Sequence, residues 1–158
     1  NFESGNLDTA IKIATAEYDL FMRVDSNTRG HVQWYNFTVT PNGNKKIKIN
    51  IVNFRKYRTL YSQSLRPYVY SHSNPKNGWK QGCSNIKYDQ KLLRYEFLTD
   101  IFSVQTLTYN CLIFEYEFEA DEMVQFAYCP PFTYTDNLRM ISSLHAFNRS
   151  PECKIFKE

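Results

Sequence analysis

Regular alternation of apolar and polar residues is the feature that most limits the folds open to this chain. In residues 46–51 every second residue is isoleucine, and the residues between them are lysine or asparagine. Residues 112–119 alternate in the same way, with aromatic or aliphatic residues followed by glutamates. A period of two puts one kind of side chain on each face of a β-strand. We therefore expect strands with one buried face and one solvated face.

Other expected strands are marked by similar alternation or by a high content of aromatic and β-branched residues. They cover residues 10–15, 17–24, 31–39, 67–71, 92–98 and 123–129. Segments rich in asparagine, glycine and proline separate several of them and are typical of turns. Eight or nine short strands joined by turns predict an all-β fold, an antiparallel β-sandwich.

One segment near the C-terminal end has the spacing of an amphipathic helix. Its apolar positions, three residues apart, are Leu138, Ile141 and Leu144. We expect Thr135 to cap this helix, with Asp136 in its first turn. The chain is therefore expected to consist of a β-sandwich domain over residues 1–134, followed by a helix and an exit strand over residues 135–158.

Length and composition fit one folded domain. The chain has 158 residues, of which 42% are hydrophobic and 22% are charged, with a net charge of +3. This charge is too small to indicate a nucleic-acid partner, and no apolar run is long enough to span a membrane. Because the chain opens at Asn1 rather than at methionine, we expect it to be a piece of a longer protein.

The cysteines give no sign of a metal site. None of the four lies in a C-x-x-C pair, and a domain of this size does not depend on disulfides for its stability. We expect reduced thiols and a cytoplasmic location, with Cys111 and Cys129 buried as small hydrophobic side chains. The four positions are Cys83, Cys111, Cys129 and Cys153.

The chain also lacks the residue patterns of an enzyme. It has three histidines, none of them in an H-x-x-E or H-E-x-x-H arrangement, and it has no nucleophile elbow or phosphate-binding loop. We expect His31 to form hydrogen bonds at a strand edge and His145 to pack in the core. The sequence thus predicts no catalytic residue, no metal ligand and no bound cofactor in this chain.

The aromatic content allows more than one interpretation. The chain has 12 phenylalanines, 12 tyrosines and 2 tryptophans, which core packing alone can explain. Alternatively, exposed aromatic side chains could form a face that binds a peptide or a glycan, for which Trp79 is the best candidate. Aromatic residues around Pro130 and Pro131 could instead form an apolar surface for another domain.

Short blocks of sequence also occur in a specific order along nearly the whole chain. They include Phe2-Glu3-Ser4-Gly5-Asn6-Leu7, Glu17-Tyr18-Asp19-Leu20, Asn50-Ile51-Val52-Asn53-Phe54, Arg66-Pro67 and Phe126-Ala127-Tyr128-Cys129-Pro130-Pro131-Phe132-Thr133-Tyr134-Thr135. In this order and spacing, the blocks resemble the N-terminal domain of cytosolic carboxypeptidases, zinc peptidases that remove glutamates from tubulin.

This resemblance implies a sandwich that packs against the chain's own C-terminal peptidase domain and helps it to fold. The zinc ligands and catalytic residues of the family belong to that following domain. The full-length protein is then expected to remove C-terminal or side-chain glutamates from proteins such as tubulin. A free-standing β-sandwich that binds a peptide or a glycan remains the alternative.

Two sets of site residues follow from the resemblance. The first is a domain interface formed by Tyr128, Pro131, Phe132, Thr133 and Tyr134. The second is a cationic group that would steer glutamate-rich tails, formed by Arg55, Lys56 and Arg58. We expect the steering to weaken with salt.

Overall fold

The structure, a computed structural model, describes residues 2–43, 45–92, 108–119 and 122–148. Their elements in chain order are β1 (Leu7–Ala14), β2 (Glu17–Met22), β3 (Asn36–Val39), β4 (Lys46–Phe54), the 3-10 helix η1 (Leu60–Gln63), β5 (Tyr68–Ser71), the 3-10 helix η2 (Pro75–Asn77), β6 (Lys80–Gln81), β7 (Ser84–Leu92), β8 (Thr108–Glu117), β9 (Val124–Ala127) and α1 (Tyr134–Asn148). The chain divides into two compact units. The sandwich unit is Gly5–Pro130, and the helix unit combines Asn1–Ser4 with Pro131–Glu158.

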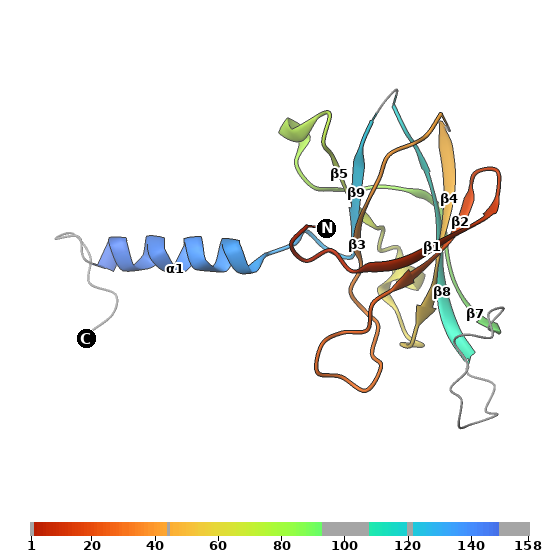
Figure 1. Cartoon of the computed structure of the whole chain (residues 1–158), viewed down its shortest axis with the longest axis horizontal. Helices are drawn as coiled ribbons and strands as arrows, with labels where there is room; N and C mark the ends of the chain where they lie inside the picture. Colours follow the sequence, from red (N-terminus) through yellow and green to blue (C-terminus); the bar gives the residue numbers. More distant parts are fainter. Residues whose placement is uncertain (1, 44, 93–107, 120–121, 149–158) are drawn as a thin grey trace. The chain divides into compact units, whose positions relative to one another are not determined.

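The strands form two sheets that face each other in the sandwich unit (Figure 1). One sheet has the strand order β1-β2-β4-β8-β7, and the other has the order β3-β9-β5-β6. The predicted β-sandwich with a helix near its C-terminal end is confirmed. The fully or almost fully buried core side chains between the sheets include Phe37, Ile49, Ile51, Val69, Leu112, Phe114 and Phe126.

The alternation in the sequence matches the pairing of β4 with β8. These strands run antiparallel, with Ile49 opposite Phe114 and Lys48 opposite Glu115. Ile49 and Phe114 lie in the core, while the charged residues point to the opposite face, where Lys46 Nζ lies 2.6 Å from a Glu115 carboxylate oxygen. A slip of one residue would move the isoleucines to the solvated face, so the pattern specifies this register.

The pairing of β2 with β4 departs from the predicted antiparallel arrangement, because these two strands run parallel. Between them the chain passes through β3 of the other sheet, and a parallel pair requires such a long crossover. The side chain of Asn53 continues the pairing where the ladder ends. Its Oδ1 accepts the Met22 N–H at 3.1 Å, and its Nδ2 donates to the Met22 carbonyl at 2.8 Å.

Aromatic rings fill much of the space between the sheets. Phe37 stacks on Phe126 with a centroid distance of 5.5 Å. Phe114 and Tyr116 contact the same ring at 5.7 and 5.2 Å. Core packing therefore accounts for these four rings, as the simplest interpretation of the aromatic content predicts.

Some predicted elements differ from the structure. The strand predicted over 31–39 begins only at Asn36, since Val32 and Tyr35 are buried but join no ladder. Strands β6 and β7 are additions, and the described side chains of β7 are mostly exposed, which explains its weak sequence pattern. Residues 93–98 and the expected exit strand lie outside the described residues.

The three described cysteines are free thiols, and Cys153 lies outside the described residues. Cys111 is fully buried in β8, as expected. The expectation that Cys129 is buried is wrong, because β9 already ends at Ala127 and Cys129 is exposed.

Candidate functional site

Tyr128, the first of the predicted interface residues, is a packed residue of the sandwich unit. Its ring meets the rings of Tyr35 and Tyr61 edge to face, at centroid distances of 6.2 and 6.1 Å. Its backbone N–H donates to the Tyr35 carbonyl at 3.0 Å. The side chain is half-buried, so only part of it can contact anything outside the sandwich.

The tyrosines beside Tyr128 form a buried polar pair. The hydroxyl oxygens of Tyr35 and Tyr61 lie 2.6 Å apart. Burial raises the pKa of both phenols well above the ordinary value of tyrosine. Tyr88 stacks on Tyr61 at 6.4 Å, and burial raises its pKa to about 12. These phenols stay protonated at neutral pH and have no acid or base chemistry to offer there.

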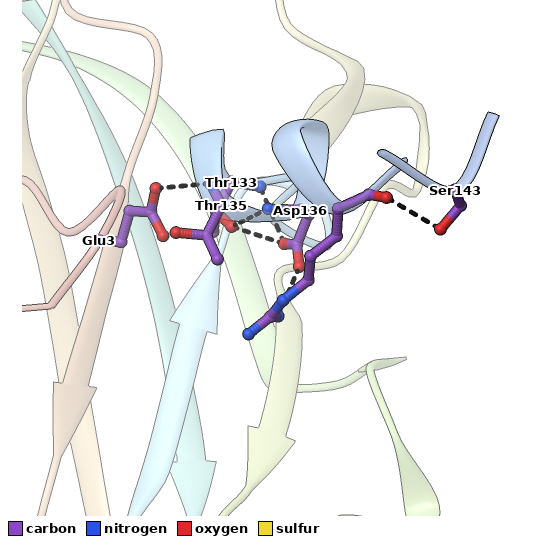
Figure 2. Close-up of polar contacts among 6 residues, drawn as sticks. Glu3, Thr133, Thr135, Asp136 and Ser143 are labelled. Carbon is purple, nitrogen blue, oxygen red and sulfur yellow. Dashed lines mark hydrogen bonds and ion pairs between the residues drawn. The ribbon is translucent and has the colours of Figure 1, made fainter. Parts of the chain in front are cut away.

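Thr133, another predicted interface residue, caps helix α1 in the helix unit (Figure 2). Its hydroxyl oxygen accepts the Asp136 N–H at 3.1 Å, and its own N–H donates to Asp136 Oδ2 at 3.0 Å. This reciprocal arrangement is a capping box with aspartate in the role of glutamate. The predicted cap, Thr135, is wrong because the helix begins at Tyr134, whereas a cap at Thr135 would make Asp136, two residues later, the first helical residue.

Thr135 instead contacts the N-terminal end of the chain. Its backbone N–H donates to Glu3 Oε1 at 2.9 Å, and the carboxyl group of Glu3 points toward the first turn of α1 in Figure 2. The hydrogen bond from this N–H, followed by one from the Thr135 hydroxyl, lowers the pKa of the Glu3 carboxyl below its ordinary value. The role of Glu3 is not predictable from local sequence, since the two residues of this contact are 132 positions apart.

Helix α1 presents apolar side chains that nothing among the described residues buries. Leu138, Met140, Ile141, Leu144 and Phe147 are all 37–49% exposed. At 100° per residue they cover about half of the helix circumference. No helix in the described ranges has the length and apolar character needed to cross a bilayer.

The remaining predicted interface residues also belong to the helix unit. Phe132 and Tyr134 are 65% and 69% exposed, and Pro131 is half-buried. Both rings are therefore available for contact, whereas Thr133 is engaged in the cap. The five predicted residues thus divide between the units: Tyr128 lies in the sandwich unit and the other four lie in the helix unit.

The predicted steering residues follow β4 in the chain. Arg55, Lys56 and Arg58 are all exposed. The guanidinium of Arg55 lies over the Tyr109 ring, 5.2 Å from its centroid, so this charge is held in position. Lys56 and Arg58 form no ion pair with any residue in the described ranges.

The described residues offer no place for a metal ion. Among them, no three histidine, cysteine, aspartate or glutamate side chains come together. His31 forms hydrogen bonds, as expected, through its backbone N–H to the Thr28 hydroxyl and its carbonyl to the Asp25 N–H, but it lies in a loop rather than at a strand edge. The expected role of His145 is wrong, because it is exposed on α1 rather than packed in a core. Trp79 is half-buried and contacts Tyr70 at a centroid distance of 5.5 Å.

Comparison with solved structures gives the class of protein that has this fold. A metallo-carboxypeptidase from Pseudomonas aeruginosa matches 92% of this chain with a TM-score of 0.54 and 16% identity. One from Burkholderia cenocepacia matches 96% with a TM-score of 0.57 and 13% identity. In both cases the match covers 32% of the other chain. The sandwich therefore has the fold of one part of larger metallo-carboxypeptidases.

Sequence comparison makes the assignment specific. Residues 1–129 match the profile of the cytosolic carboxypeptidase N-terminal domain, and the chain belongs to this family. It is 34% identical to mouse cytosolic carboxypeptidase 3 over 98% of its length and 36% identical to human cytosolic carboxypeptidase 6 over 93%. It spans only 15% of the mouse protein and 27% of the human one.

Proposed function

We propose that this chain is the non-catalytic N-terminal domain of a cytoplasmic zinc metallocarboxypeptidase. In this proposal, it packs against the peptidase domain that follows and supports the folding of that domain. The full-length protein removes C-terminal or side-chain glutamates from proteins such as tubulin. Zinc would belong to the following domain, which is supported by the two metallo-carboxypeptidase structures, because the match to this fold covers only 32% of each of their chains.

The exposed apolar face of α1 is the observation that carries this proposal. A helix of 15 residues is marginally stable in water unless its apolar face packs against something. Burying its five half-exposed apolar side chains in a neighbouring domain would contribute roughly 1 kcal/mol each or more. The chain spans only 15% and 27% of two cytosolic carboxypeptidases that it resembles, which supports another domain of the same polypeptide as the partner of this face.

The end of the family profile and the end of the sandwich unit agree to within one residue. The family profile ends at residue 129, and the sandwich unit ends at Pro130. Helix α1 follows both boundaries, although the match to mouse cytosolic carboxypeptidase 3 extends over 98% of the chain. We infer that α1 and the exposed rings of Phe132 and Tyr134 form the contact with the peptidase domain.

A pair of matched substitutions in the full-length protein tests this proposal. Leu144→Asp places a charge on the apolar face of α1, whereas Ala146→Asp places it on the opposite face, two residues away. We expect Leu144→Asp to reduce zinc content, thermal stability and release of glutamate from a tubulin tail peptide, and Ala146→Asp to leave all three nearly unchanged. Equal effects of the two variants would contradict the interface.

The steering role of the cationic residues is a separate part of the proposal. Lys56 and Arg58 would attract an acidic tail, and salt would weaken this attraction. Reversing both charges should lower kcat/KM for a glutamate-rich peptide at low ionic strength and leave it almost unchanged at high ionic strength. Reversal of Lys76, an exposed lysine in η2, is the control.

The alternative function makes a different prediction. A free-standing binding module would bind a peptide or a glycan tightly without any further domain, with Trp79 and Tyr70 at the contact. Titration of the 158-residue chain with glutamate-rich peptides and with a glycan panel distinguishes the two. Tight binding that is lost in Trp79→Ala would favour the binding module over the accessory domain.

A further inference from the structure

The N-terminal tetrapeptide belongs to the helix unit rather than to the sandwich unit that follows it in sequence. The chain enters the sandwich between Ser4 and Gly5 and leaves it between Pro130 and Pro131. The hydrogen bond from the Thr135 N–H to Glu3 Oε1 joins the N-terminal tetrapeptide to the start of α1, and both residues belong to the helix unit. Figure 2 shows the Glu3 carboxylate directed at this first helical turn.

The contact provides a partner for a backbone N–H in the first turn of α1. The N–H groups at the start of a helix have no partner within the helix, and a carboxylate there also interacts favourably with the helix dipole. The Thr133 hydroxyl accepts a hydrogen bond from the N–H of Asp136, the third helical residue. The Glu3 carboxylate accepts one from the N–H of Thr135, the second helical residue.

The backbone of the tetrapeptide is shaped for this role. Ser4 has a φ of +65°, a left-handed conformation that non-glycine residues seldom adopt. It lies at the end of the tetrapeptide, directly before the chain enters the sandwich. Phe2, which directly precedes Glu3, is 43% exposed, so the helix unit has three exposed aromatic rings outside the body of α1: Phe2, Phe132 and Tyr134, the last at the first helical residue.

We propose that Glu3 is a positioning residue of the domain interface: the tetrapeptide holds the first turn of α1 in place, so that the helix and the three exposed rings meet the following domain as a preformed surface. The identity of that domain rests on the proposed function above. The contact between Glu3 and Thr135 does not, because it lies entirely within this chain.

NMR titration of the 158-residue chain tests the contact itself. The Thr135 amide resonance should shift as the Glu3 carboxyl titrates, at a pH below the ordinary range of glutamate. Asp136, which is paired with Arg139, is the other carboxyl near this turn, and its own titration must be followed separately. Glu3→Ala and Glu3→Gln should both abolish the Glu3-linked shift.

Hydrogen exchange adds a second measurement on the same variants. Glu3→Ala should speed exchange of the Thr135 N–H roughly tenfold, as the loss of a helix cap does, while Glu3→Gln, which keeps an acceptor oxygen, should restore most of the protection. Asp8→Asn, which removes an exposed carboxylate in β1, should change neither the chemical shift nor the exchange rate of the Thr135 amide. A Thr135 amide whose chemical shift and exchange rate are the same in the wild type and in Glu3→Ala would overturn the proposal.

The full-length protein then tests the positioning role. Glu3→Ala should increase the rate of hydrogen exchange along α1 several-fold relative to the wild type. Glu3→Gln should have a rate close to that of the wild type. Unchanged exchange in Glu3→Ala would overturn the positioning role. If Glu3 controls Thr135 but Leu144→Asp has no effect, the proposed function fails and the contact stands. If Leu144→Asp acts and Glu3 does not, the contact fails and the function stands.

Discussion

The hydroxyl oxygens of Tyr35 and Tyr61 lie 2.6 Å apart in the buried part of the sandwich unit. Tyr35 is completely buried and Tyr61 is 7% exposed, so neither hydroxyl can easily exchange its partner for water. The pair ties the segment before β3 to helix η1, two elements that no strand pairing connects.

Removal of both hydroxyls should therefore cost less than the sum of the two single removals. Tyr35→Phe or Tyr61→Phe leaves a buried hydroxyl without its partner and should lower the free energy of unfolding by about 1–3 kcal/mol. The double variant should lose clearly less than the sum of the two single losses. Urea unfolding of all four proteins measures this cycle, and strictly additive losses would contradict the pairing.

The same phenols predict how stability changes at high pH. Tyrosine in an unfolded chain loses its proton near pH 10, whereas burial raises the pKa of Tyr88 to about 12 and that of Tyr35 and Tyr61 well above 10. Below pH 10 both states are protonated and stability is unaffected. Above pH 10 only the unfolded state readily ionises, so the free energy of unfolding should fall as the pH rises.

Absorbance at 295 nm during an alkaline titration checks this expectation. Most tyrosines should titrate near pH 10, and a late group should titrate only near pH 12 or together with unfolding. Tyr35→Phe should reduce the amplitude of the late group. A single transition near pH 10 in a chain that is still folded by circular dichroism would contradict the expectation.

Gly82 lies so close to the side chain of Val69 that a larger residue should not fit at this position. A Cβ atom there would lie 2.8 Å from one methyl carbon of Val69 and 3.2 Å from the other. Val69 is buried, so Gly82→Ala should destabilise the domain by about 1–3 kcal/mol. In a Val69→Ala background, which removes both methyl groups, the added cost of Gly82→Ala should largely disappear. An equal cost in both backgrounds would show that crowding is not the cause.

Asn53 predicts a large effect of a single amide. Its side chain forms both hydrogen bonds with the backbone of Met22, and Asn53→Ala would leave that N–H and that carbonyl unpaired in a buried place. We expect a loss of at least about 2 kcal/mol in thermal or urea unfolding. Asn42→Ala, at an exposed loop position, should stay within about 0.5 kcal/mol of the wild type.

The sequence contains enough information to predict the sandwich but not all of its pairing. Alternation is visible in β2, β4 and β8, although consecutive residues of β2 (19–22) and of β8 (109–114) are buried on both faces, so the expected solvated face is present only over part of each of these two strands. Alternation could not reveal that β2 and β4 run parallel, since a period of two is the same for either direction. Edge strand β7 was missed because Ile86 and Tyr88, both half-buried, are its clearest apolar signal.

The candidate site was only partly predictable. The exposed rings of Phe132 and Tyr134 and the amphipathic helix could be identified from the local sequence. The start of the helix was misjudged because Thr133 and Thr135 are both acceptable caps, and only the reciprocal bonds between Thr133 and Asp136 decide between them. The contact between Glu3 and Thr135 could not be predicted, because the two residues are 132 positions apart in the sequence.

Hydrogen exchange of α1 tests the central claim most directly. The amides of residues 138–147 should be weakly protected in the 158-residue chain, because nothing in its described part covers the apolar face. In the full-length protein, we expect the same amides to exchange at least roughly tenfold more slowly, while those of β4 and β8 stay slow in both. Equal exchange of α1 in the two proteins would contradict its role as the contact with a following domain.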